Sequence, residues 1–196
     1  MRCSSILRLL LLAPRRVRIA RTGICVLAPL FAILDSSSAA APSLEWAVKA
    51  EYLFKLVPFI DWPESAFASP AQPFRLCVVG DDPFDGLLDE AGQGQSAGQH
   101  PIAIVRLKNA TPDDHCQLMY IAGDQQFVTQ SLSAASGFPV LTVTDAQSGD
   151  KGIVNFVNVQ NHVRFEIDQQ AALRNHLNVS SKLLGIALPQ TAGHAP

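Results

Sequence analysis

Basic residues, cysteines and aromatic residues are scarce in most of this 196-residue sequence. Beyond residue 40 there are nine Lys and Arg against sixteen Asp and Glu, which gives that part a net charge of −7. Such an acidic chain has no electrostatic means of holding a phosphate backbone or an anionic lipid surface. The composition therefore excludes nucleic acid as a main partner, and we expect no direct membrane insertion of this part.

Patterns that hold metals or cofactors are also missing. The histidines are scattered, with no pair at metal-ligand spacing: His100, His115, His162, His176 and His194. The stretch Gly80-Asp-Asp-Pro-Phe-Asp-Gly86 lacks the glycine pattern of a dinucleotide loop. Asp81, Asp82 and Asp85 could hold a divalent cation, but their spacing fits no calcium loop, and a capped turn is favoured. We therefore assign no catalytic residue, no metal ligand and no cofactor.

The first forty residues differ from the rest of the chain. They hold six of the fifteen basic residues and a single acidic one, Asp35. The basic stretch ends at Arg21, an apolar run follows over Gly23–Leu34, and small residues come next. This order is typical of a signal peptide, and the apolar run is short for a membrane span, which needs about 20 residues. We predict a leader over residues 1–40, cleaved after Ala40, and export to the periplasm; an uncleaved anchor is the alternative.

Only two cysteines remain beyond the predicted leader, Cys77 and Cys116. In an oxidising compartment, two cysteines are most simply one disulfide. The loop that such a disulfide closes is about 40 residues long, for which the chain-entropy model gives roughly 4 kcal/mol. Two buried free thiols are the alternative.

Hydrophobic periodicity predicts helices and strands in alternation. Helices are predicted from residue 44 to about 57 and from Pro83 to Glu90 with Asp82 as N-cap. Two more are predicted to end at Ala135 and at Asn175, with Asp124 and Asp168 as their N-caps. Strands are predicted at Phe74–Gly80, Pro101–Leu107, Gln117–Gly123, Pro139–Thr144, Gly152–Val159 and His162–Asp168. Gln160-Asn161 joins the last two strands as a two-residue hairpin connection. Residues 92–98 are predicted to be a flexible turn, and residues 179–188 a helix or a last short strand.

The order of these elements predicts the fold class. Strand and helix alternate from residue 74 to 144, which implies parallel pairing with right-handed crossovers. The final hairpin adds antiparallel strands at one edge. We therefore predict a three-layer α/β domain over residues 41–188, with a mixed, mainly parallel sheet of about six strands and a C-terminal antiparallel hairpin. Residues 189–196 are predicted to be a flexible tail.

The aromatic residues crowd into one stretch. Six of them lie in the 22 residues from 46 to 67: Trp46, Tyr52, Phe54, Phe59, Trp62 and Phe67. Most should pack under the first helix, since aromatics at helical spacing usually belong to the core. We select Trp46, Phe59 and Trp62 as candidate anchors for a protein partner. Arg164 and Glu166 are further candidates, because they alternate with apolar residues in the last strand; a merely solvated face is the alternative.

Four segments in order resemble the YfiR/HmsC-like family. They are Ala47–Leu56 with Asp61-Trp-Pro63, Phe74–Phe84, Val163–Asp168 and Ser180–Leu184, and they are spread along nearly the whole length of the predicted domain. Each segment alone is a weak signal, whereas four in sequence behind a predicted leader are fairly specific. Cys77 and Cys116 match two cysteines of the family. Some relatives carry a second pair near the segment that matches Asp145–Gly152, and this chain has none there.

The resemblance implies a regulatory binding protein rather than an enzyme. Members of the YfiR type bind the periplasmic sensor part of an inner-membrane diguanylate cyclase and hold it inactive, so that their release raises cyclic-di-GMP and promotes biofilm. We therefore expect a periplasmic repressor of such a cyclase or of another membrane sensor, and the resemblance also allows a homodimer.

Two other functions compete with this one. A small-ligand-binding sensor domain would have a pocket at the carboxyl ends of the central strands, near Gly80–Phe84 and Gly123–Asp124. A hydrolase is a remote third, since it would need an activated serine or cysteine and we identify none.

Overall fold

A computed structural model describes residues 44–145 and 149–189 of the chain. The predicted leader over residues 1–40 and the predicted tail, apart from residue 189, lie outside these ranges. No helix in the described ranges combines the length and the apolar character needed to cross a bilayer.

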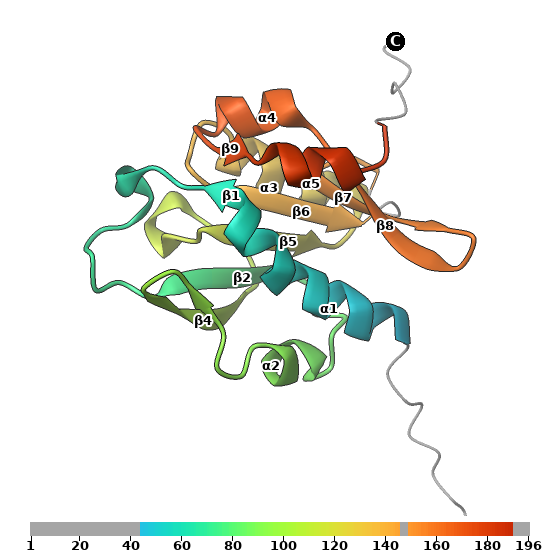
Figure 1. The fold of residues 1–196 in the computed structure, drawn as a ribbon, viewed down its shortest axis with the longest axis horizontal. Coiled ribbons are helices and arrows are strands. Elements are labelled where there is room, and N and C mark those ends of the chain that lie inside the picture. Colours follow the sequence, from blue (N-terminus) through green and yellow to red (C-terminus); the bar gives the residue numbers. More distant parts are fainter. Residues whose placement is uncertain (1–43, 146–148, 190–196) are drawn as a thin grey trace, which may run out of the picture. The chain divides into compact units, whose positions relative to one another are not determined.

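A seven-stranded sheet forms the middle layer of the domain (Figure 1). Its strands are β2 (Phe74–Gly80), β3 (Ser96–Ala97), β4 (His100–Leu107), β5 (Leu118–Ala122), β6 (Leu141–Asp145), β7 (Val154–Val159) and β8 (His162–Ile167). They lie side by side in the order β3-β4-β2-β5-β6-β7-β8. The strands from β4 to β7 pair in parallel, while β3 and β8 pair antiparallel at the two edges. The prediction of a mixed, mainly parallel sheet with a C-terminal antiparallel hairpin is confirmed.

Helices cover both faces of this sheet. They are α1 (Leu44–Leu56), α2 (Leu87–Ala91), α3 (Gln125–Ala135), α4 (Gln169–Arg174) and α5 (Ser181–Ile186), with single turns of 3-10 helix at η1 (Val57–Phe59), η2 (Glu64–Ala66) and η3 (Pro112–Asp114). Figure 1 shows α1 and α5 in front of the sheet and α3 behind it. A separate pair of two-residue strands, β1 (Ile60–Asp61) and β9 (Asn178–Val179), joins the end of α1 to the C-terminal segment. The three predicted layers are therefore present.

The two faces of the sheet pack into separate hydrophobic clusters, because side chains alternate along each strand. In β2, for example, Phe74, Leu76 and Val78 belong to one cluster, and Cys77 and Val79 belong to the other. The first cluster, here called the α1 face, includes buried residues of α1, α2, α4 and α5. The second, here called the α3 face, consists of Cys77, Val79, Cys116, Met119, Ile121, Val128, Ala135 and Val140.

The predicted caps Asp124 and Asp168 and the predicted hairpin are confirmed. Asp124 and Asp168 each accept a hydrogen bond from the backbone N–H three residues later, at 2.8 Å in both cases. Each aspartate thereby satisfies a donor that the first turn of its helix leaves unpaired. Gln160 and Asn161 have φ angles of 50° and 64°, which is the backbone of a type I′ hairpin turn.

Two local predictions are wrong. Helix α2 begins at Leu87 with Gly86 as its N-cap, whereas we predicted a start at Pro83. Asp82 accepts a hydrogen bond from the backbone N–H of Phe84 (2.9 Å), so it stabilises a turn and not the helix. The predicted flexible turn over residues 92–98 contains β3, which pairs with the start of β4. A two-residue strand is too short to show the alternation by which strands are detected.

Candidate functional site

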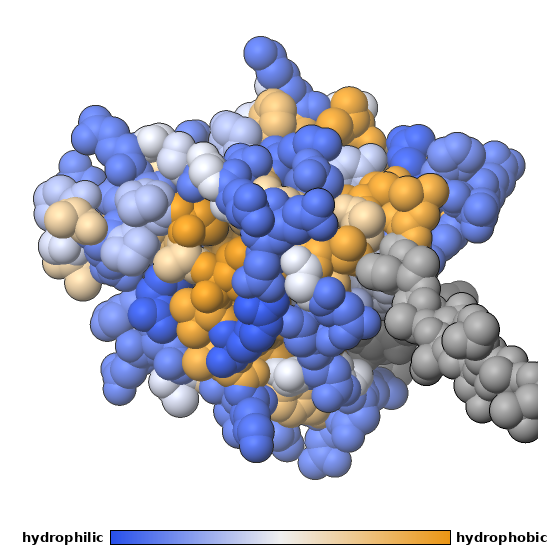
Figure 2. Space-filling model, turned by 90° about the horizontal axis from the view of Figure 1, so that it is seen from below, coloured by the Kyte–Doolittle hydropathy of each residue, from blue (hydrophilic) through white to orange (hydrophobic). Residues whose placement is uncertain are grey.

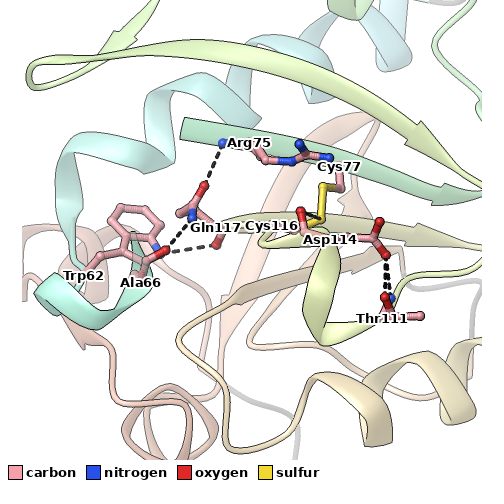
Figure 3. Close-up of a disulfide and its surroundings, with 8 residues drawn as sticks. All are labelled: Trp62, Ala66, Arg75, Cys77, Thr111, Asp114, Cys116 and Gln117. Carbon is pink, nitrogen blue, oxygen red and sulfur yellow. Dashed lines mark hydrogen bonds between the residues drawn. A yellow bond between two sulfur atoms is a disulfide. The ribbon is translucent and has the colours of Figure 1, made fainter. Parts of the chain in front are cut away.

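The two cysteines that the sequence singles out form a disulfide (Figure 3). Cys77 lies in β2 and Cys116 lies just before β5, with their Cα atoms 5.9 Å apart. Because β2 and β5 are parallel neighbours, their pairing brings together two cysteines that are 39 positions apart in sequence. Both are buried on the α3 face.

The turn that places Cys116 beside β2 is shaped by η3. Thr111 and Asp114 form a capping box in which the backbone N–H of Thr111 donates to the Asp114 carboxylate at 2.7 Å. The next residue, His115, has a φ angle of 47°, in the left-handed region that few residues other than glycine occupy. The chain therefore turns sharply immediately before the disulfide.

Gln117 links the disulfide to a neighbouring segment, and only 1% of its surface is exposed. Its side-chain Oε1 accepts a hydrogen bond from the backbone N–H of Arg75 (2.7 Å), and its Nε2 donates to the carbonyl of Ala66 (2.5 Å). The indole N–H of Trp62 donates to the Gln117 carbonyl (3.2 Å), as Figure 3 shows. Gln117 thus ties this end of the sheet to residues 62–66, here called the Trp62 corner.

A groove of about 480 Å³ lies beside the Trp62 corner, between the end of α1 and β3. Trp62 packs edge-on against Phe74, with ring centroids 5.0 Å apart, and Phe67 stacks on the ring of His100 at 4.1 Å. These four rings line the groove. Figure 2, which looks at the molecule from the side of α2 and β4, shows a band of apolar side chains flanked by polar ones.

A more enclosed cavity of about 340 Å³ lies at the edge of the α3 face and is called the Cys116 cavity below. Its walls come from η2, η3, the start of β5 and the segment from the end of α3 to Val140. It therefore lies at the amino ends of β5 and β6, against both the disulfide and the Trp62 corner.

The Cys116 cavity is at the opposite end of the strands from the predicted ligand pocket. A Cβ atom on Gly80 would lie 2.6 Å from the Phe127 ring, and one on Gly123 would lie 2.7 Å from it. The Phe127 ring, in the first turn of α3, therefore packs directly on both glycines. The ring therefore occupies the space next to Gly80 and Gly123, where part of the expected pocket would lie.

Sequence reasoning missed a buried charged cluster under the first half of α1. Only 2% of Lys49 is exposed, and its ammonium group donates to Glu45 (2.5 Å) and to Asp145 at the end of β6. It also lies 4.2 Å from the centroid of the Trp46 ring. The hydrogen bond from Lys49 lowers the pKa of Glu45 below its usual value. The sequence does contain a sign that Lys49 is buried. Lys49 follows Trp46 by three residues and precedes Leu53 by four, which is the spacing of residues on one side of a helix.

Asp82, once considered as a cation ligand, takes part in an ion-pair cluster instead. Its carboxylate accepts a hydrogen bond from Arg106 of β4 (2.6 Å), and Arg106 also pairs with Asp89 of α2. The hydrogen bonds from Arg106 lower the pKa of Asp89. Within residues 44–145 and 149–189, no three or more His, Cys, Asp or Glu residues are arranged to hold a metal ion.

The residues selected for partner contact lie on different parts of the domain. Trp46 and Phe59 are half-buried and pack against the α1 face. Trp62 is also half-buried, but it lines the groove. Arg164 is exposed in β8, as expected for a solvent-facing position.

Glu166 does not lie on the solvent face, so this part of the prediction is wrong. Only 5% of it is exposed, and its carboxylate accepts a hydrogen bond from Lys151 (2.7 Å). The chain after α5 crosses beside β8 at this point, where Glu166 and Leu188 form a parallel bridge. Alternation along β8 cannot reveal that Lys151, which precedes β7, pairs with the carboxylate of Glu166.

One sequence match with a catalytic motif was also overlooked. Gly94-Gln-Ser-Ala-Gly98 has the Gly-x-Ser-x-Gly spacing of a nucleophile elbow, a sharp turn from a strand into a helix. Ser96 lies instead in β3, exposed, and its hydroxyl hydrogen-bonds no other residue that the structure describes. The match therefore assigns no catalytic role to Ser96.

Comparison with known proteins adds one positive finding. Residues 46–188 match the protein-family model described as YfiR/HmsC-like. The match begins within α1 and ends two residues after α5. No curated protein sequence gives a significant match.

Proposed function

The chain belongs to the YfiR/HmsC-like family, and from this membership we propose that the protein represses an inner-membrane diguanylate cyclase by binding its periplasmic sensor part. Membership of this family suggests that the protein is a periplasmic regulator of cyclic-di-GMP signalling and that its role is regulatory rather than catalytic. The match over residues 46–188 carries the proposal, because it spans the whole sheet and both helical layers. Cleavage of the predicted leader and export to the periplasm are part of the same proposal.

Within this proposal, the groove at the Trp62 corner is the contact surface for the cyclase. Aromatic rings line it, and two exposed charged residues, Lys55 and Asp61, stand beside them. Aromatic anchors surrounded by a polar rim are the composition of many protein–protein contacts. Trp62 is the best placed of the candidate anchors, because it belongs to this groove and is partly exposed.

Deletion of the gene tests the proposal at the level of the cell. We expect deletion to raise cyclic-di-GMP, measured by mass spectrometry of cell extracts, and expression of the wild-type protein to restore the lower level. Unchanged cyclic-di-GMP after deletion would contradict the proposed function.

A pair of charge reversals tests the contact surface. When it is expressed in the deletion strain, Lys55→Glu reverses a charge at the rim of the groove and should lower cyclic-di-GMP less than the wild-type protein does. Lys182→Glu changes another solvent-exposed lysine, on α5 outside the groove, and should restore repression fully. If both variants lower cyclic-di-GMP equally at equal protein levels, the groove is not the contact surface for the cyclase.

Affinity capture from solubilised inner membranes tests for the partner itself. We expect the tagged wild-type protein to retain a membrane diguanylate cyclase, and Lys55→Glu to retain less of it than Lys182→Glu. Recovery of a different membrane sensor would replace the partner, and an empty capture would contradict direct binding.

A further inference from the structure

We propose that the Cys116 cavity binds a small molecule that has an apolar body and a positively charged group. This proposal goes beyond the regulatory function above and does not rest on it, because it follows from the lining of the cavity alone.

The size and the floor of the cavity define the apolar body. Its volume of about 340 Å³ is within the range of roughly 300–1,000 Å³ in which small-ligand pockets fall. Met119, Ala135 and Val140 are buried and supply an apolar floor, and Phe138, which is 42% exposed, stands in the lining. A large exposed aromatic side chain in the wall of a partly open cavity is well placed to cover an apolar ligand. The body that fits is about the size of one aromatic ring with a short chain.

The charges around the cavity define the polar group. Asp113 contributes a carboxylate, and no lysine or arginine is among the described residues that line the cavity. His115 is the one other described lining residue whose side chain can carry a charge. The C-terminal end of α3, at Ala134 and Ala135, forms one wall. The carbonyl groups at the end of a helix carry a partial negative charge. Both sources favour a cation over a neutral group and disfavour an anion.

A ligand in the Cys116 cavity would also act on the Trp62 corner. Ser65 and Ala66 line the cavity, and the carbonyl of Ala66 accepts a hydrogen bond from Gln117. Gln117 in turn accepts the hydrogen bond from the Trp62 indole. A ligand that presses on Ala66 therefore moves part of a hydrogen-bonded unit that includes Trp62, and Trp62 fluorescence should report its binding.

Three probes of similar size and different charge test the binding class. They are 2-phenylethylamine, which is cationic at neutral pH, neutral 2-phenylethanol and anionic 3-phenylpropanoate. By titration calorimetry of the purified protein, we expect the amine to bind about fivefold more tightly than the alcohol, as one exposed ion pair allows. The anion should bind most weakly. Binding of the anion as tight as that of the amine would overturn the proposal, and so would no binding of any probe.

Substitutions locate the binding. Ala134→Phe fills the cavity from an exposed position in α3, and it should weaken amine binding by more than about tenfold. Ser133→Phe adds the same ring next to it, outside the lining, and should leave binding unchanged. Asp113→Asn should remove the preference for the amine over the alcohol while the alcohol still binds. Unchanged amine binding by Ala134→Phe, with the fold verified by circular dichroism, would place the site elsewhere and overturn the proposal.

Fluorescence tests the connection to Trp62. The chain has two tryptophans, so Trp46→Phe leaves Trp62 as the only indole emitter. We expect the amine to shift Trp62 emission in this variant, and the shift to disappear when Ala134→Phe is added. Amine binding without any change in Trp62 emission would overturn the connection.

Discussion

The two faces of the sheet differ in how they are stabilised. On the α1 face, four helices contribute to a cluster of 24 buried hydrophobic residues, and several aromatic rings pack edge-on within it. On the α3 face, one helix covers the sheet and the cluster has 8 buried residues, two of which are the bonded cysteines. The covalent cross-link is therefore found in the smaller of the two hydrophobic clusters.

This difference has a simple physical consequence. Burial stabilises a fold roughly in proportion to the apolar area removed from water. A disulfide acts mainly by restricting the unfolded chain, so its contribution does not depend on how much surface lies around it. We therefore expect the α1 face to be weakened most by loss of packing and the α3 face to be weakened most by loss of the cross-link.

The largest expected effect comes from removing a ring on the α1 face. Phe84 is fully buried between Trp46 and Tyr120, with centroid separations of 5.8 and 4.9 Å. Phe84→Ala should lower the free energy of unfolding by about 4 kcal/mol through lost burial and a residual cavity. Urea unfolding measures this, and the loss should be the same with and without reductant. Val128→Ala, equally buried on the α3 face, should cost only about 2 kcal/mol; a larger cost there would reverse the comparison.

Removing the disulfide should have an effect of nearly the same size. Replacement of both Cys77 and Cys116 by Ala should lower the free energy of unfolding by roughly 4 kcal/mol in oxidising buffer, because the loop between them is no longer closed. In reducing buffer the variant and the wild type should unfold at nearly the same urea concentration. Equal stability without reductant would show that the cross-link does not compensate for the small cluster.

The ion pair between Lys49 and Asp145 tests whether the stability of the α1 face also depends on a buried charge. Lys49→Met should cost about 3 kcal/mol in urea unfolding, because it removes the ammonium group that pairs with the largely buried Asp145. Adding Asp145→Asn should recover part of this loss, since residues that pair directly are not additive. Strict additivity of the two substitutions would show that the pair is not coupled.

The smallest expected effect is a change in the pH dependence of stability. The pKa of Glu45 is lowered from its usual value of 4.5 in the folded protein, chiefly by the hydrogen bond from Lys49. The resulting stability is fully present above the usual pKa and is lost as the pH falls through the lower, folded-state pKa. Thermal melts from neutral to acidic pH should therefore show a shallower acid decline for Glu45→Gln. Glu51→Gln, on the exposed side of the same helix, is the control.

Much of the fold could be predicted because its signals are local. The buried strand at 74–80 stands out as an apolar run between turn residues, and Asp124 and Asp168 mark helix starts by their side chains alone. The start of α2 was misplaced because Asp82 and Pro83 form a turn that has the same residues as a helix start. The site was harder to predict, since the groove and the Cys116 cavity each combine segments that are far apart in the chain.

The sequence by itself determined the alternation of the longer helices and strands and the hairpin turn at Gln160-Asn161, and it favoured a disulfide between the two cysteines that follow the predicted leader. These depend on neighbouring residues or on composition. Only the tertiary structure decided that Lys49 and Glu166 are buried, that the Phe127 ring packs on Gly80 and Gly123, and that the cavity lies beside Cys116. Burial depends on which distant segments pack together, and no local pattern in the chain contains that information.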